Sequence, residues 1–262
     1  MLVLIEHIIL GMVQGLTEFL PISSTGHLVL FRQLFGLQEA GLLFDTMLHF
    51  GTLIAVMIVF WPEIKHLLSN PFGKLARLLV AGTIPTAIIG LSFADYFEEI
   101  SRTGVTIGYE FLATGVIIWA VEFMRKGTRR FEQISYTDAL IIGTLQGAAI
   151  LPAISRSGLT IAGALMRGIE RSEAARFSFL LSLPAILGAV VLQTKKLVEQ
   201  PIDNSAMIPM LIGTISAAVA GYYAIRWMLK IISTGSMKSF AIYVWLLGAA
   251  ILGMQFFGYW AF

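Results

Sequence analysis

Two short polar stretches interrupt an otherwise apolar sequence, and they hold the residues best suited to chemistry. The first contains Gln14 and Glu18, then Pro21, then residues 23–27 (Ser-Ser-Thr-Gly-His). The second is residues 152–160 (Pro-Ala-Ile-Ser-Arg-Ser-Gly-Leu-Thr). A hydroxyl-rich, glycine-containing turn that starts a helix presents backbone N–H groups to an anion, and an arginine adds a charged fork. We therefore interpret the two stretches as halves of one phosphate-handling site.

The first stretch predicts a metal ligand pair and a nucleophile. Gln14 and Glu18 are four residues apart, so they share one helix face, and their oxygens suit a hard divalent cation such as Mg²⁺ or Ca²⁺. Ser24, or Ser23, could attack phosphorus while His27 moves the proton. Direct attack by water activated at His27 is the alternative mechanism.

The second stretch predicts an anion site centred on Arg156, whose guanidinium can hold two phosphoryl oxygens at once. An ionisable side chain at membrane depth is costly, which favours functional roles for Glu18 and Arg156, although a structural ion pair between them is the alternative. Glu110 and His49 could support the cavity or serve packing alone. The predicted substrate-binding residues are Ser23, Thr25, Gly26, Ser155, Ser157 and Thr160, although hydroxyls inside membrane helices often only bond a backbone carbonyl.

Composition places these stretches inside a membrane protein. The chain is 57% apolar and 13% charged, and its mean hydropathy is +0.82. The net charge of +2 gives no reason to expect nucleic acid, and the lack of cysteine excludes disulfides. The start carries Glu6 before any basic residue, so we expect no cleavable signal peptide. The predicted spans are 46–62, 78–94, 103–121, 177–194, 204–225 and 239–262.

The chain nearly repeats itself at half its length. Residues 11–15 correspond to 143–147 and 22–26 to 154–158, both at an offset of 132, while 82–90 correspond to 213–221 at an offset of 131. We therefore expect one membrane domain, 1–262, built from two repeats of about 1–130 and 131–262. Duplicated membrane proteins tend to place their site where the repeats meet.

Each polar stretch is flanked by apolar limbs that are too short to cross a bilayer alone. Each unit is therefore either one kinked span or a re-entrant hairpin. With hairpins, the two repeats are inserted in opposite directions, and most basic residues share one face: Lys65, Lys74, Arg77, Arg125, Lys126, Arg129, Arg130, Arg167, Arg171, Arg176, Arg226, Lys230 and Lys238. The other face keeps Arg32, Arg102, Lys195 and Lys196, beside Glu39, Asp95, Glu98, Glu99, Glu199 and Asp203.

The hairpin arrangement is the one that obeys the positive-inside rule. It places residues 125–130 in the cytoplasm and both termini outside. Irregular backbone at membrane depth must be shielded by protein or line a cavity, so we expect the hairpins to meet near the middle. The small-residue pairs Gly11/Gly15 and Gly143/Gly147 would allow their backbones to approach closely. The predicted fold is an all-α polytopic membrane protein with two inverted-topology repeats, each a re-entrant helical hairpin plus three transmembrane helices.

The motifs resemble those of a known family. Gln14-Gly-Leu-Thr-Glu18 followed by the Ser-Ser-Thr-Gly-His turn at 23–27, and the Ser-Arg-Ser turn at 155–157, are similar to the two signatures of undecaprenyl-diphosphate phosphatases of the bacitracin-resistance type. Ala153 stands where that family's pattern has glycine. The resemblance implies inverted repeats, a divalent cation, and removal of the terminal phosphate of a C55 polyprenyl diphosphate in cell-wall precursor recycling. It assigns the cation to Gln14 and Glu18, catalysis to the first turn, and phosphate binding to the second.

We therefore expect a plasma-membrane phosphatase for a polyprenyl diphosphate lipid, with its site open to the outer face; a homodimer is compatible with such a chain. A transporter or flippase for a phosphorylated lipid is the alternative, because inverted repeats with broken helices are also typical of secondary transporters. The presence of Ser24 and His27 beside Glu18 favours an enzyme, because a carrier needs no nucleophile and base. A scaffold is a third, weaker interpretation.

Overall fold

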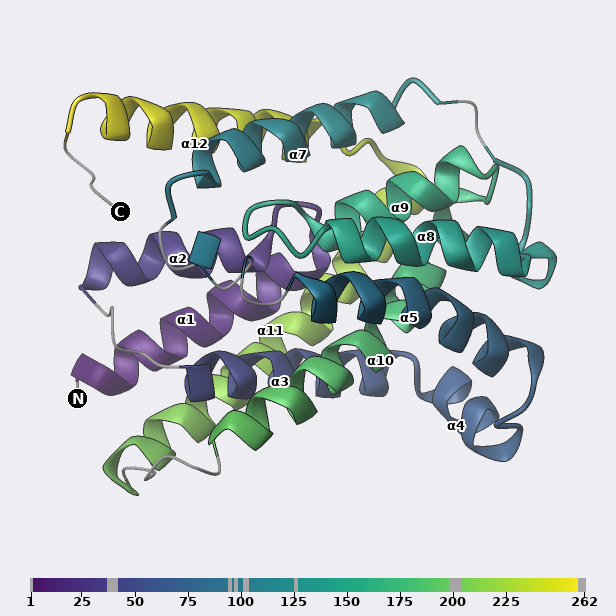
Figure 1. The fold of residues 1–262 in the computed structure, drawn as a ribbon, viewed down its shortest axis with the longest axis horizontal. Coiled ribbons are helices and arrows are strands. Elements are labelled where there is room, and N and C mark those ends of the chain that lie inside the picture. Colours follow the sequence, from purple (N-terminus) through teal and green to yellow (C-terminus); the bar gives the residue numbers. More distant parts are fainter. Residues whose placement is uncertain are drawn as a thin grey trace.

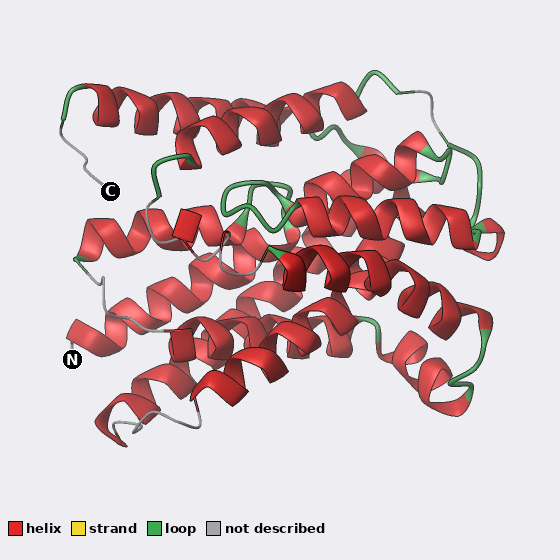
Figure 2. Ribbon diagram, in the orientation of Figure 1, coloured by secondary structure: helices red, strands yellow, loops and turns green. Residues whose placement is uncertain are grey.

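The structure is a computed structural model that describes residues 2–36, 42–93, 96, 99–100, 104–124, 127–197 and 204–258. Helices make up nearly all of it, and the described residues form no β-sheet (Figure 2). The helices are α1 (Leu2–Phe19), α2 (Ser24–Phe35), α3 (Leu42–Val59), α4 (Trp61–Ser69), α5 (Lys74–Ser92), α7 (Ile107–Val121), η1 (Phe131–Gln133), α8 (Tyr136–Ala148), α9 (Arg156–Met166), α10 (Arg171–Leu197), α11 (Asn204–Thr234) and α12 (Lys238–Phe256). The prediction of an all-α chain is confirmed.

Several helices have the length and composition to cross a membrane. Within the described residues, α5, α10, α11 and α12 meet that requirement individually, and α3 meets it together with α4, from which it is bent by 84°. The span predicted at 103–121 contains α7, which is apolar but only 15 residues long. The chain is therefore a multi-pass membrane protein. On α5 the side chains of Val80, Ile84, Ile88 and Leu91 form one face and are more than half exposed, as expected of a surface against lipid.

Both polar stretches are turns at which the chain reverses direction in the middle of the molecule. α1 runs inward from one end and α2 returns to that end, whereas α8 runs inward from the opposite end and α9 returns there (Figure 1). Pro21 and Pro152 lie in the two turns, where the helical hydrogen-bond pattern stops. Ser23 and Ser155 then cap the returning helices by accepting the N–H of the residue three positions on. The structure thus has the hairpins rather than kinked spans.

The paired glycines do allow close packing, but the expected partner is wrong. A Cβ on Gly11 would lie 2.2 Å from the Gly213 carbonyl oxygen, and one on Gly143 would lie 1.8 Å from that of Gly82. The hairpins therefore use these glycines to pack α1 on α11 and α8 on α5, not to pack on each other. The hairpins meet through their turns instead.

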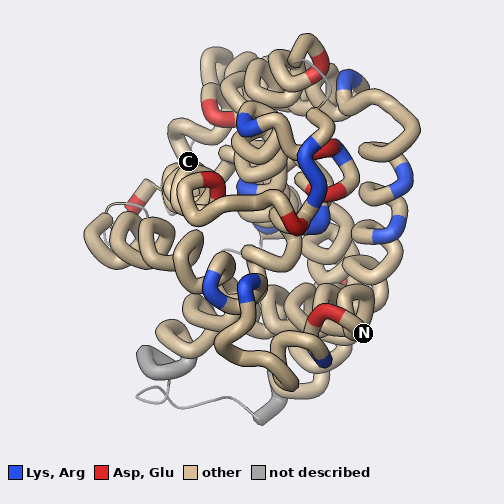
Figure 3. The backbone as a smooth tube through the Cα atoms, turned by 90° about the vertical axis from the view of Figure 1, so that its right-hand side faces the viewer, with Lys and Arg blue, Asp and Glu red and all other residues tan. Residues whose placement is uncertain are grey.

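One end of the molecule carries most of the described basic residues (Figure 3). Several of them form ion pairs with Asp or Glu. At this end the Asp138 carboxylate, at the start of α8, accepts hydrogen bonds from Arg129 at 2.6 Å and from Arg167 at 2.7 Å. Burial raises the pKa of Asp138, but the hydrogen bonds from Arg129, Arg167 and Ser135 outweigh it, so the pKa is well below its usual range. Arg171 similarly pairs with Glu122 at 2.8 Å.

α1 begins, and α12 ends, at the opposite end of the molecule from these ion pairs (Figure 1). That arrangement fits the charge asymmetry seen in the sequence. Some of the charged residues used in that prediction lie outside the described residues: Glu39, Asp95, Glu98, Arg102, Arg125, Lys126, Glu199 and Asp203.

Candidate active site

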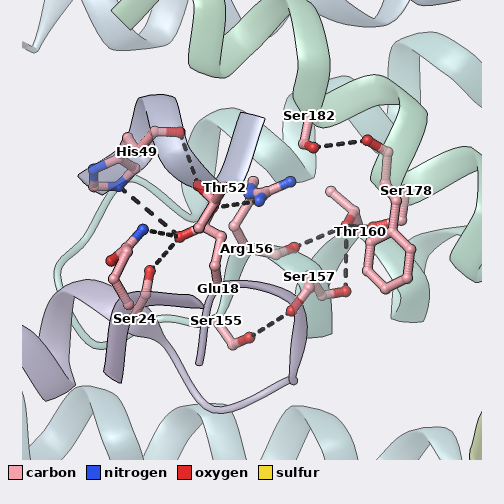
Figure 4. Close-up of polar contacts among 12 residues, drawn as sticks. Glu18, Ser24, His49, Thr52, Ser155, Arg156, Ser157, Thr160, Ser178 and Ser182 are labelled. Atoms are coloured by element: carbon pink, nitrogen blue, oxygen red, sulfur yellow. Dashed lines mark hydrogen bonds and ion pairs between the residues drawn. The ribbon is translucent and has the colours of Figure 1, made fainter. Parts of the chain in front are cut away.

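The Glu18 carboxylate, in the last turn of α1, gathers polar groups from both hairpins (Figure 4). Its Oε2 atom accepts a hydrogen bond from Ser24 Oγ at 2.5 Å and one from Gln14 Nε2 at 2.9 Å. Its Oε1 atom accepts one from Arg156 Nη2 at 2.6 Å. All four side chains were predicted site residues, and the fold brings them into direct contact. We call Gln14, Glu18, Ser24 and Arg156 the Glu18 cluster.

The turns of the two hairpins hold the cluster together by exchanging hydrogen bonds. Ser23 Oγ donates to the Pro152 carbonyl at 2.6 Å, and Ser157 Oγ donates to the Leu20 carbonyl at 2.9 Å. A serine of each turn thus bonds a backbone carbonyl of the other turn. Such a carbonyl needs a partner within the protein, because the membrane interior offers no water to bond it. A Cβ on Gly26 would lie 2.7 Å from Phe111 Cζ and 3.0 Å from the Ala153 Cβ, so this glycine is required by the close approach of the turns.

His27, the expected base for Ser24, bonds to other groups. Its Nδ1 lies 2.6 Å from the Ser23 carbonyl oxygen, which can only accept, so Nδ1 carries a proton. Its Nε2 lies 2.8 Å from the Tyr243 hydroxyl, and the two rings stack with their planes 16° apart. Sequence reasoning missed Tyr243, since a tyrosine within an apolar span gives no signal of its own.

The imidazole beside the cluster is that of His49, on α3. Its Nε2 lies 3.9 Å from Glu18 Oε2, and its Nδ1 lies 2.8 Å from the Asp45 carbonyl oxygen. The carbonyl again requires a proton on Nδ1, so Nε2 of a neutral His49 is free to receive a proton. His49 was expected either to support the cavity or to serve packing alone.

The remaining predicted hydroxyls mostly bond to the protein itself. Ser155 caps α9 and lies 3.3 Å from the Ser157 hydroxyl, while Thr160 Oγ1 lies 2.8 Å from the Arg156 carbonyl oxygen and 2.6 Å from Ser178 Oγ. Thr25, the second residue of α2, is half-buried. Among the predicted hydroxyls, Ser24 is therefore the one hydrogen-bonded to the cluster carboxylate.

Comparison with known proteins supports the identification made from the motifs. A sequence model of the family described as "Bacitracin resistance protein BacA" matches residues 7–250. The chain belongs to the BacA family. A protein of Bacillus cereus named undecaprenyl-diphosphatase 4 is 53% identical over 252 residues, which are 96% of this chain and 97% of that protein.

The similarity extends over nearly the full length to proteins of other bacteria. An undecaprenyl-diphosphatase of Carboxydothermus hydrogenoformans is 50% identical and covers 95% of this chain and 97% of its own length. One of Halothermothrix orenii is 42% identical, with 94% and 95% covered. The resemblance to bacitracin-resistance phosphatases is thus confirmed as membership of the BacA family.

In this BacA-family chain, the atoms around Glu18 fit a hard divalent cation in their chemistry. Gln14 donates a hydrogen bond to Glu18 through Nε2. The Oε1 atom of the same side chain is buried and has no hydrogen-bond partner among the described residues. Carboxylate, amide and hydroxyl oxygens are the ligands that Mg²⁺ and Ca²⁺ prefer. No group of three or more His, Asp or Glu side chains capable of chelation occurs in the described ranges, so phosphate and water would have to complete the shell.

Proposed function

We propose that this chain is a membrane phosphatase that hydrolyses undecaprenyl diphosphate to undecaprenyl phosphate and inorganic phosphate. The observation that carries the proposal is the Glu18 cluster, in which a serine hydroxyl on a carboxylate lies beside an arginine from the other half of the chain. Members of the family with about half their residues in common with this chain are named for that activity. By the same relationship, the product is the lipid carrier of cell-wall synthesis.

The proposed reaction begins with Arg156 holding the terminal phosphoryl group. Its Nη2 bonds Glu18, while its Nη1 is buried without a partner in the described part of the chain and is free to donate to a phosphoryl oxygen. Oxygens that gain charge as the phosphoryl group transfers are stabilised by this preorganised donor. The apolar faces of the surrounding helices would hold the isoprenoid tail.

Ser24 is the nucleophile that the geometry favours. Its Oγ would form a bond to the terminal phosphorus while the bond from phosphorus to the bridging oxygen breaks and polyprenyl phosphate departs. Glu18 Oε2, 2.5 Å from Ser24 Oγ, would take the serine proton. Water then attacks the phosphoserine, the bond from phosphorus to Ser24 Oγ breaks, and the protonated Glu18 returns its proton to Oγ. Inorganic phosphate leaves with the remaining proton of the water. Direct attack by water, with Glu18 or His49 as the base, is the alternative that retains the same cluster.

A divalent cation held by Gln14 and Glu18 would neutralise charge on the diphosphate oxygens when bound. The Nδ1–H of His27 donates a hydrogen bond to the carbonyl of Ser23, the residue that precedes the nucleophile. His27 would therefore act on the reaction by holding the Ser23 backbone in place. We therefore assign His27 to positioning of the turn.

We further propose that the two halves are inverted-topology repeats within a single domain. Support comes from matching contacts: α1 packs on α11 as α8 packs on α5, while α3 meets α10 and α7 meets α12. The equivalent carbonyls of Leu20 and Pro152 each accept a hydroxyl from the other hairpin. With the basic end in the cytoplasm by the positive-inside rule, both termini would be outside. Recycling of a lipid carrier after its export favours a site that opens to the outer face.

The decisive experiment measures phosphate release from a C55 diphosphate by the purified protein in detergent, with and without a chelator. We expect turnover that the chelator removes, and that Glu18→Gln abolishes or greatly weakens in a folded protein. Glu170→Gln is the matched control, because Glu170 lies exposed at the end of the molecule that carries the ion pairs. If the wild type releases no phosphate yet moves the lipid across liposomes, the carrier alternative replaces the phosphatase.

A further inference from the structure

The turn that presents Arg156 is held by two side chains of α7. Residues 152–155 have no helical hydrogen-bond ladder, so their backbone groups need other partners at this depth. Ser23 bonds one of them, the Pro152 carbonyl. Glu110 and Thr114, four residues apart on one face of α7, bond three more.

The contacts are short and involve both donors and acceptors. Glu110 Oε2 accepts the Ala153 N–H at 2.6 Å, and its Oε1 accepts the Thr106 hydroxyl at 2.6 Å. Thr114 Oγ1 donates to the Ala153 carbonyl at 2.8 Å and accepts the Ser155 N–H at 3.1 Å. Glu110 and Thr114 are 7% and 2% exposed, so water cannot easily replace either of them.

We propose that Glu110 and Thr114 are positioning residues of the phosphatase: they fix the 153–155 backbone and thereby aim the Arg156 guanidinium at Glu18 and the terminal phosphate. This inference rests on the proposed function. Within the described residues, the hydrogen bonds of both side chains go to the turn and to Thr106, which precedes α7, rather than to the Glu18 cluster, so they act through the turn. Ser155 begins α9 as its cap, and Arg156 is the first residue of that helix, so a shift of the Ser155 N–H moves Arg156 directly. Misplacement of a catalytic group by about 1 Å can cost on the order of 100-fold in rate.

The chain allows a test with nearly isosteric variants. Thr114→Val removes both bonds at constant shape, and we expect kcat to fall about 10-fold or more with a smaller change in KM. Thr114→Ser keeps the hydroxyl and should restore kcat to within about 3-fold. Thr214→Val is the matched control, because Thr214 is also buried in a span, but among the described residues its hydroxyl bonds only the Met210 carbonyl of its own helix.

Glu110 gives a second, independent comparison if Thr114→Val does not fold. Glu110→Gln can turn its oxygen to the Ala153 N–H and its NH₂ to the Thr106 hydroxyl, so kcat should stay within about 3-fold, whereas Glu110→Met should lose about 10-fold or more. Normal kcat in folded Glu110→Met or Thr114→Val would overturn the proposal.

A double-mutant cycle separates positioning from general stability. If Thr114 acts through Arg156, the valine substitution should cost several-fold less in an Arg156→Lys background than in the wild type. Equal losses in both backgrounds would make Thr114 a structural residue and refute the inference. Wild-type turnover measured in the same assay keeps the outcomes distinct: its absence would reject the proposed function, while its presence with unchanged variants rejects only the positioning role.

Discussion

Replacing Arg156 by lysine tests whether the two hairpins share one phosphate. The guanidinium has Nη2 on Glu18 at 2.6 Å and leaves Nη1 for the substrate, so it serves two partners at once. Lysine keeps the charge but has a single ammonium group, which cannot reproduce that planar fork. The variant should therefore lose at least one charge-assisted hydrogen bond, worth about 1.5–3 kcal/mol. At about 1.36 kcal/mol per tenfold, kcat should fall roughly 10- to 150-fold.

The assay is steady-state phosphate release from a C55 diphosphate in detergent, with kcat and KM determined separately. Because the interaction strengthens as charge develops, kcat should fall far more than KM rises. Arg171→Lys is the control: Arg171 pairs with Glu122 at 2.8 Å at the charged end of the molecule, so turnover should be unchanged. A normal kcat with a raised KM would make Arg156 a ground-state anchor, as in a carrier. Normal values of both would leave only a structural ion pair.

Three further outcomes can be measured on the same protein. Tyr243→Phe removes the hydroxyl at His27 Nε2 but keeps the stacked ring, so kcat should fall about 3- to 10-fold, as for loss of one neutral hydrogen bond; an unchanged kcat would separate His27 from the reaction. Because the folded-state pKa of Asp138 is lowered, its stabilisation is complete above the unfolded pKa of about 3.9 and is lost as pH falls below it. The melting temperature of the wild type should therefore drop below about pH 4, and that of Asp138→Asn should be lower at neutral pH and less pH-dependent; parallel curves would refute the assignment. The chain has no cysteine of its own, so a thiol introduced at Leu34 should react with an impermeant reagent outside intact cells while one at Lys65 should not; the reverse pattern would invert the proposed orientation.

Much of the architecture follows from local properties of the sequence. Apolar length distinguishes spans from limbs that are too short to cross, and Pro21 and Pro152 lie within polar stretches where the structure has turns. The basic residues favoured hairpins over kinked spans, because only hairpins place most of them on one face of the membrane. The motifs named the family, since two long signatures at the right separation are rarely accidental.

The partners of individual atoms were decided only by tertiary structure. Gln14, Glu18 and Ser24 are near in sequence, but Arg156 comes from the other half of the chain, and nothing local states which carboxylate oxygen it bonds. His27 looked like the base because it follows Ser24 closely, yet its position on α2 directs it to Tyr243. The glycine pairs correctly predicted close helix packing, but the predicted partner helix was wrong. A small side chain allows another backbone to approach and does not specify which backbone it is.

Glu110 shows the same division most clearly. The sequence marks a carboxylate in an apolar span as costly, and so as a residue with some role. That it bonds the Ala153 N–H depends on α7 lying against the second turn. Apolar length and charge can be read along the chain, and they therefore predicted the spans, the polar breaks and the end of the molecule at which most basic residues gather. Hydrogen bonds depend on direction and a separation of about 3 Å, so the pairing within the site was set only when the two hairpins met.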